Sequence, residues 1–168
     1  MGNKDRIRIK RKWNKKKEKW HHELVDQLYY DHSLLNMNLG CIVFKEKEFN
    51  PIEWIKYEVD SNKRPAADLV IFEKKDEMNY RCLIIEVISS YEHEVNIGYN
   101  KASKKLAIYY NLGIDAMQLI GNNFSIAKDI QLPFYLEIEG YIAFRKLGEG
   151  VQIEKPYFWK KRKMAEIR

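Results

Sequence analysis

Two carboxylates stand in otherwise apolar surroundings. Asp68 lies at the start of the apolar run Leu69–Phe72, and Glu86 interrupts the run Leu83–Ile88. A buried carboxylate is costly unless a cation or hydrogen bonds compensate it. On neighbouring strands the two side chains can converge on one face, and oxygen ligands are those that Mg²⁺ prefers. The alternative for Glu86 is an ordinary ion pair with a lysine or arginine that faces the core.

A helix after these segments offers a cation for either interpretation. At about 100° per residue, its apolar side chains form one arc. Lys105 falls near the middle of that arc, Lys101 lies at its edge, and Lys104 points away from it. A lysine centred on an apolar face is not an ordinary solvated charge, although its ammonium can snorkel to water. We therefore expect Lys105, with Lys101 as its rival, to direct its ammonium at the strand carboxylates.

The elements that must position these residues can be predicted from apolar periodicity. Segments 67–72 and 82–88 are predicted to form a hairpin, whose second strand is apolar on both faces as a central strand should be. Helices are predicted over about 15–32 and 96–112, the second ending at Gly113. Further strands are predicted at 39–44, 54–59, 116–120 and within 134–146. A strand, a helix and a second strand in succession imply one parallel crossover, so we expect a mixed α/β fold whose mixed central sheet is flanked by helices.

The net charge of +6 is unevenly distributed. Residues 1–22 carry a net +8 and residues 155–168 a net +5, whereas residues 23–154 carry −7. We interpret these three parts as a basic N-terminal arm, a single α/β domain and a basic C-terminal tail. Such basic ends are typical of proteins that bind a phosphate backbone, because each neutralised phosphate releases a counterion. The residues expected to bind nucleic acid are Lys10, Arg11, Lys12, Lys15, Lys16, Lys17, Lys160, Lys161, Arg162 and Lys163.

Composition excludes several classes of protein. The 168 residues suffice for one core, and no apolar run approaches the roughly 18 residues of a membrane span. The two cysteines, Cys41 and Cys82, stand outside any metal-binding spacing. No apolar signal segment follows Met1, so we expect a cytoplasmic protein that does not contact a membrane. The arms also carry aromatic rings that could stack on unpaired bases, namely Trp13, Trp20, Tyr157, Phe158 and Trp159.

Three segments in this order resemble the core of the PD-(D/E)XK nuclease superfamily. They are Arg64-Pro-Ala-Ala-Asp-Leu-Val-Ile-Phe72, Leu83-Ile-Ile-Glu-Val-Ile-Ser89 and Lys105-Leu-Ala-Ile-Tyr-Tyr-Asn-Leu-Gly-Ile114. Within the superfamily they are most similar to restriction endonucleases of the Uma-two type, in which the lysine has moved from the second strand to the helix. Position 88 is accordingly Ile, where the plain motif has Lys. The resemblance covers roughly residues 64 to 120 and implies a restriction-endonuclease-like core.

The resemblance also implies roles for individual residues. Asp68, Glu86 and the carbonyl group of Val87 would hold Mg²⁺ or Mn²⁺, and Lys105 would be the catalytic lysine. Glu23 on the first helix is a candidate for an additional carboxylate ligand. Some members of the superfamily use a histidine from the first helical region instead, which brings in His21 and His22; ordinary surface or core roles remain the alternative for both.

Two functions of different classes follow. The first is a metal-dependent endonuclease that hydrolyses phosphodiester bonds, with DNA favoured over RNA as substrate. The second is a nucleic-acid-binding or protein-docking module that keeps the fold without the activity. Cleavage of paired strands would favour a symmetric homodimer. Divalent-metal binding that depends on both Asp68 and Glu86 distinguishes the two functions.

Overall fold

The computed structural model describes residues 3–31, 42–48, 66–88, 97–111, 114–146, 148–159 and 163–168. Its elements are α1 (Asn3–Tyr30), β1 (Ile42–Glu48), β2 (Ala66–Lys74), β3 (Asn79–Val87), α4 (Ile97–Asn111), α5 (Ile114–Lys128), β4 (Phe134–Lys146), β5 (Gly150–Glu154) and β6 (Lys163–Ile167). The predicted strand 54–59 and the basic residues Lys160, Lys161 and Arg162 lie outside the described residues.

The strands form one mixed sheet of six, in which β1, β2, β3, β4 and β5 are neighbours in that order. β1, β2 and β3 are antiparallel to one another, and β3 pairs in parallel with β4. The other edge of β4 carries two short antiparallel partners, β5 along Ile142–Lys146 and β6 along Phe134–Ile138. The predicted mixed α/β class is therefore confirmed, as is the predicted β2–β3 hairpin.

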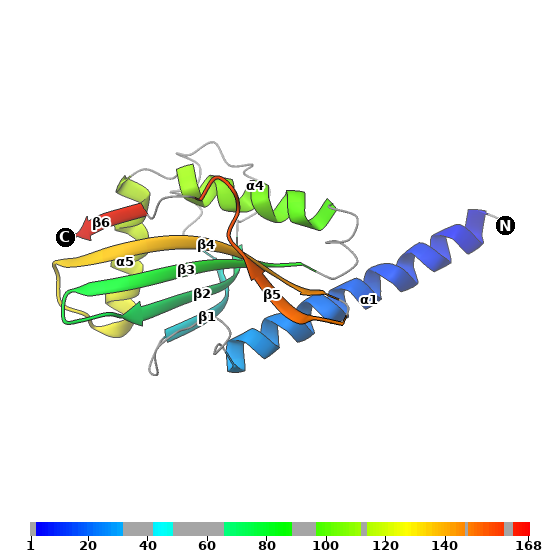
Figure 1. Ribbon diagram of the computed structural model, residues 1–168, viewed down its shortest axis with the longest axis horizontal. Helices are drawn as coiled ribbons and strands as arrows, with labels where there is room; N and C mark the ends of the chain where they lie inside the picture. Colours follow the sequence, from blue (N-terminus) through cyan, green and yellow to red (C-terminus); the bar gives the residue numbers. More distant parts are fainter. Residues whose placement is uncertain are drawn as a thin grey trace.

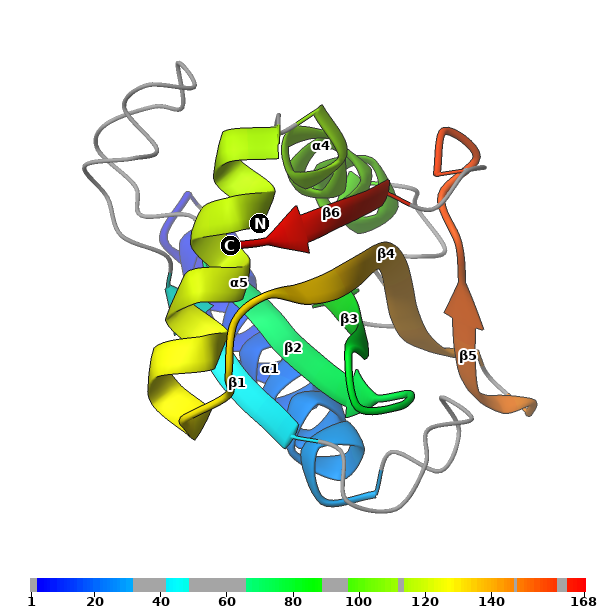
Figure 2. The ribbon, with the colours of Figure 1, turned by 90° about the vertical axis from the view of Figure 1, so that its left-hand side faces the viewer.

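Helices cover both faces of the sheet (Figures 1 and 2). On one face, α4 and α5 pack on the even-numbered side chains of β3 and β4 and form the larger core cluster around Leu106, Phe124 and Ile84. On the other face, Leu24, Val25 and Leu28 of α1 pack in a smaller cluster. β3 is buried on both faces, which explains why its sequence is apolar without alternation. Only a compensated or functional carboxylate is expected in such a strand.

The prediction of a strand at 116–120 is wrong, because these residues belong to helix α5. An apolar run of five residues does not distinguish a strand from a buried helical segment. Met117, Ile120 and Phe124 recur at helical spacing and are all buried against the sheet. The predicted parallel crossover exists, but it runs from β3 through α4 and α5 to β4. Residues 134–146 form one long strand.

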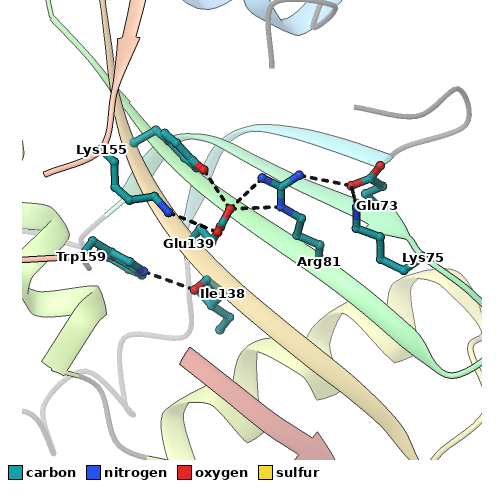
Figure 3. Close-up of polar contacts among 8 residues, drawn as sticks. Glu73, Lys75, Arg81, Ile138, Glu139, Lys155 and Trp159 are labelled. Carbon is teal, nitrogen blue, oxygen red and sulfur yellow. Dashed lines mark hydrogen bonds and ion pairs between the residues drawn. The ribbon is translucent and has the colours of Figure 1, made fainter. Parts of the chain in front are cut away.

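The C-terminal segment is not a separate tail. Trp159 is fully buried, and its indole N–H donates to the carbonyl oxygen of Ile138 at 3.3 Å (Figure 3). Gly140 makes room for the ring, because a Cβ there would lie 2.6 Å from it. β6 then adds Ile167 to the core. The expectation that Trp159 stacks on bases is therefore wrong, since the ring is a core residue.

The predicted boundary between an N-terminal arm and the domain falls inside one continuous helix. α1 begins at Asn3 and runs through residue 22 to Tyr30. Its N-terminal half projects beyond the sheet, while its C-terminal half packs under it (Figure 1). Within the described residues, no helix is both long enough and apolar enough to cross a bilayer.

Candidate functional site

The β2–β3 ladder ends where the two carboxylates stand. The last pair in register is Leu69 with Ile85, and continuing that register places Asp68 opposite Glu86. The backbone N–H of Val87 donates to Oδ2 of Asp68 at 2.7 Å. Beyond this point β3 stays attached to β4, since the N–H of Ile88 donates to the carbonyl oxygen of Ala143 at 2.9 Å. Because the β2–β3 ladder ends here, the side chain of Asp68 can accept a hydrogen bond from the backbone N–H of Val87.

Glu86 is buried, with 3% of its surface exposed, and lies beneath α4. Nζ of Lys105 donates to its Oε2 at 2.7 Å. The other carboxylate oxygen, Oε1, has no hydrogen-bond partner within the described part of the chain. Burial and the neighbouring charge of Asp68 raise the pKa of Glu86 to about 8, although Lys105 acts in the opposite direction. The charged form of Glu86 is therefore only partly compensated by protein groups.

A histidine of the first helix joins this cluster. Nε2 of His21 lies 3.2 Å from Oδ2 of Asp68. Tyr109 of α4 is buried beside the same carboxylates: burial raises the pKa of its hydroxyl, and the charges of Glu86 and Asp68 raise it further. The cluster therefore draws side chains from α1, β2, β3 and α4. From sequence, His21 was one of two helix histidines without a distinguishing feature, although it lies on the same helix face as Leu24 and Leu28.

A pocket of about 360 Å³ opens beside the carboxylates. We name it the α1–α4 pocket; it is lined by Asn14, Lys17, Glu18, His21 and Lys101. His21 belongs to both features, because its ring lines the pocket and contacts Asp68. The pocket therefore adjoins the carboxylate cluster through His21 and carries two lysines in its lining.

The structure separates the two rival lysines and places Glu23 elsewhere. Lys105 contacts Glu86, whereas Lys101, one turn earlier on α4, is exposed and lines the pocket. Glu23 follows His21 by two residues, about 200° around α1. Its exposed carboxylate lies 3.8 Å from Nζ of Lys19. The expectation that Glu23 contributes to the cluster is therefore not met, since the helix turns it away and presents His21 instead.

The basic residues expected to bind nucleic acid lie mostly along α1. Lys10, Arg11, Lys12, Lys15 and Lys16 are exposed and Lys17 is half-buried. At the other end of the chain, the ammonium of Lys163 lies over the ring of Tyr110, 4.3 Å from its centre. Trp20 is partly exposed, and the side chain of Trp13 lies outside the described part of the structure.

A second group of buried charges lies at the hairpin end of the sheet. These side chains point to the face opposite α4 and α5, because they alternate along the strands with the side chains of the α4–α5 core. Glu139 is held there by Arg81, Tyr141 and Lys155, with the Arg81 Nη2–Glu139 Oε2 distance at 2.7 Å (Figure 3). Burial alone would raise the pKa of Glu139, but these hydrogen bonds outweigh it and lower the pKa to about 2. Glu139 is thus fully compensated by protein groups, in contrast to Glu86. A strongly perturbed, incompletely compensated carboxylate beside a pocket is the better candidate for a functional site.

The carboxylate cluster fits a hard divalent cation. The described residues contain no ready group of three His, Cys, Asp or Glu ligands. Mg²⁺, however, is commonly held by one or two carboxylates and keeps several waters. Asp68 and Glu86 supply two carboxylates, and Oε1 of Glu86 has no hydrogen-bond partner within the described part of the chain.

Comparison with known proteins adds no relative: no family model, curated protein or solved structure matches the chain.

Proposed function

We propose that this chain is a metal-dependent nuclease that hydrolyses phosphodiester bonds. The observation that carries the proposal is the meeting of Asp68, Glu86 and Lys105 where the β2–β3 ladder ends, beside a pocket lined with lysines. Asp68 and Glu86 would hold Mg²⁺ or Mn²⁺ together with the carbonyl group of Val87. In this proposal the mixed sheet flanked by helices is a restriction-endonuclease-like core.

Each protein group has a definite task in such a site. Asp68 is held in place by the Val87 N–H and by His21, so its carboxylate is oriented before substrate arrives. Lys105 brings a positive charge to the buried Glu86 and is within reach of an anion in the same space. A bound divalent cation supplies the remaining charge, polarises the phosphate and lowers the pKa of a water molecule. In the reaction, water adds to phosphorus, one bridging P–O bond breaks, and the leaving oxygen takes up a proton.

The test is nicking of supercoiled plasmid and cleavage of end-labelled DNA and RNA strands, with Mg²⁺ or Mn²⁺ and with chelator. We expect cleavage only with metal, and a loss of about a hundredfold or more in D68N, E86Q and K105M, since each removes a group near the reacting phosphate. K104M is the matched control, because Lys104 is the exposed neighbour of Lys105 on α4. D68N and E86Q as active as the wild-type protein would refute the proposal.

One observation favours the alternative of a catalytically inactive nucleic-acid-binding module. The Lys105–Glu86 ion pair compensates part of the buried charge without any metal. That function predicts that the wild-type protein binds oligonucleotides but cleaves none under any metal condition. The same samples used for the cleavage assay, measured by fluorescence anisotropy in chelator, distinguish the two functions.

A further inference from the structure

The α1–α4 pocket is positioned relative to the carboxylates by two helices. On α1, Lys17 precedes His21 by four residues, and on α4, Lys101 precedes Lys105 by four residues. Four residues are about one helical turn, a rise of roughly 5.4 Å. His21 and Lys105 contact the carboxylates, and Lys17 and Lys101 line the pocket. Two lysines from different elements therefore stand one turn away from the cluster.

The face of α1 that lines the pocket changes character along the helix. Leu24 and Leu28 are buried under the sheet. At about 100° per residue, His21, Lys17 and Asn14 continue the same face toward the N-terminus. The face therefore turns from apolar to polar and basic at the level of the carboxylates. Packing alone does not require lysine there, since Asn14 is exposed and Lys17 is only half-buried.

The pocket has the charge and size of a site for one nucleotide. Among the described residues that line it, Lys17 and Lys101 against Glu18 leave a net charge of one positive unit, apart from His21, which matches the single negative charge of a phosphodiester. Glu18 and Asn14 can bond the hydroxyl or amino groups of a nucleotide. A volume of about 360 Å³ is near the lower end of small-molecule sites, which suits one nucleotide rather than a base pair.

We propose that the α1–α4 pocket binds the nucleotide next to the scissile phosphate of an unpaired strand, with Lys17 and Lys101 on its phosphate. This inference rests on the proposed nuclease function and specifies its substrate. The strand then continues along α1 toward Lys10, over the basic half of the helix. Lys101 is thus a substrate-binding lysine, and Lys105 is the lysine of the carboxylate cluster.

The test measures binding of a short fluorescent single strand to the full chain by anisotropy, in chelator so that no cleavage occurs. The K17M/K101M variant removes both pocket lysines. The K19M/K104M variant removes the same charge from the same helices, at exposed positions that do not line the pocket. We expect Kd to rise on the order of tenfold in K17M/K101M and less than about twofold in K19M/K104M. Circular dichroism checks that both variants are folded.

The outcomes separate the two proposals. Equal weakening in both double variants would overturn the pocket assignment, because only total charge would then matter. An equal loss on a fully paired duplex of the same sequence would overturn the assignment to an unpaired strand. If the wild-type chain cleaves nothing but binding depends on Lys17 and Lys101 as described, the nuclease function fails while the nucleotide site stands.

Discussion

Glu86 and Glu139 are residues of one type, both buried in one sheet, yet their pKa values move in opposite directions. Glu139 accepts hydrogen bonds from Arg81, Tyr141 and Lys155, which lower its pKa to about 2. Glu86 has Lys105 but faces the charge of Asp68, and burial and that charge raise its pKa to about 8. The first is stable as an anion within the protein, whereas the second gains from an added cation.

This difference predicts a pH dependence of stability in chelator. Between its ordinary pKa of 4.5 and about 8, Glu86 binds a proton in the folded protein but not in the unfolded chain. The free energy of unfolding should therefore fall as pH rises through this window, and E86Q should lack the fall. Urea denaturation at a series of pH values measures both. Added Mg²⁺ or Mn²⁺ should reduce the fall for the wild-type protein, because the cation stabilises the ionised carboxylate.

The acidic part of the profile of unfolding free energy against pH serves as an internal control. Because the pKa of Glu139 is lowered, the wild-type protein and E86Q should both lose stability as pH falls from about 4.5 toward 2. Identical profiles for the two proteins above pH 4.5 would contradict the assignment of the upper window to Glu86.

Asp68, Glu86 and Lys105 could be singled out from the sequence because each is a charge set in an apolar pattern. Their proximity follows from a hairpin and a helix that periodicity also predicts. His21 could not be selected in this way, because its contact with Asp68 depends on where α1 crosses the end of the sheet. Likewise, the compensation of Glu139 comes from Arg81, 58 residues away in sequence.

At the scale of elements, periodicity succeeded where a segment has one strong pattern. The hairpin and α4 were predicted within a few residues of their observed bounds. It failed at 116–120, where the apolar run was short, and at 155–168, where basic composition concealed a buried tryptophan and a strand. A basic composition indicates that a segment is exposed to water on average, but it does not show which residues pair with distant strands. The pairing of β6 with β4 is such a long-range contact, which no local sequence pattern predicts.

The C-terminal segment provides a stability test. W159A should lower the free energy of unfolding by about 3–5 kcal/mol, because it empties a fully buried position and removes the hydrogen bond to Ile138. Y157A is the matched control: Tyr157 is two residues away and 79% exposed, so its loss should change stability by less than about 0.5 kcal/mol. Denaturant midpoints measure both. Equal effects would show that the segment is not part of the core.

At the scale of the whole molecule, the basic residues of the N-terminal region are carried on a helix rather than on a tail. The N-terminal charges lie on α1, whose other half is packed under the sheet. A phosphate backbone bound along this helix would therefore be held in a definite relation to the carboxylate cluster. Phosphate contacts of this kind position a substrate without reading its sequence.

Removing residues 1–12 tests this role. The deletion takes away six basic residues and Asp5, but leaves the buried positions of α1 and the lysines of the α1–α4 pocket. We expect the slope of log K against log[salt] to fall by several units, at roughly 0.9 per lost contact on duplex and 0.7 on single strand. Cleavage at low salt should persist. An unchanged slope would show that these charges only solvate the helix.

The pairing of β4 also constrains when this protein can fold as it is synthesised. The strands β2 and β3 form a local hairpin that can assemble early. The core beneath α5 is closed by Ile167, which fills the space that a side chain at Gly121 would need, since a Cβ there would lie 2.5 Å from it. We therefore expect this part of the core to close only after residues 163–167 are available to pair with β4, later than the carboxylate-bearing strands. Ribosome-bound nascent chains that end before β6 should thus expose apolar surface and depend on chaperones.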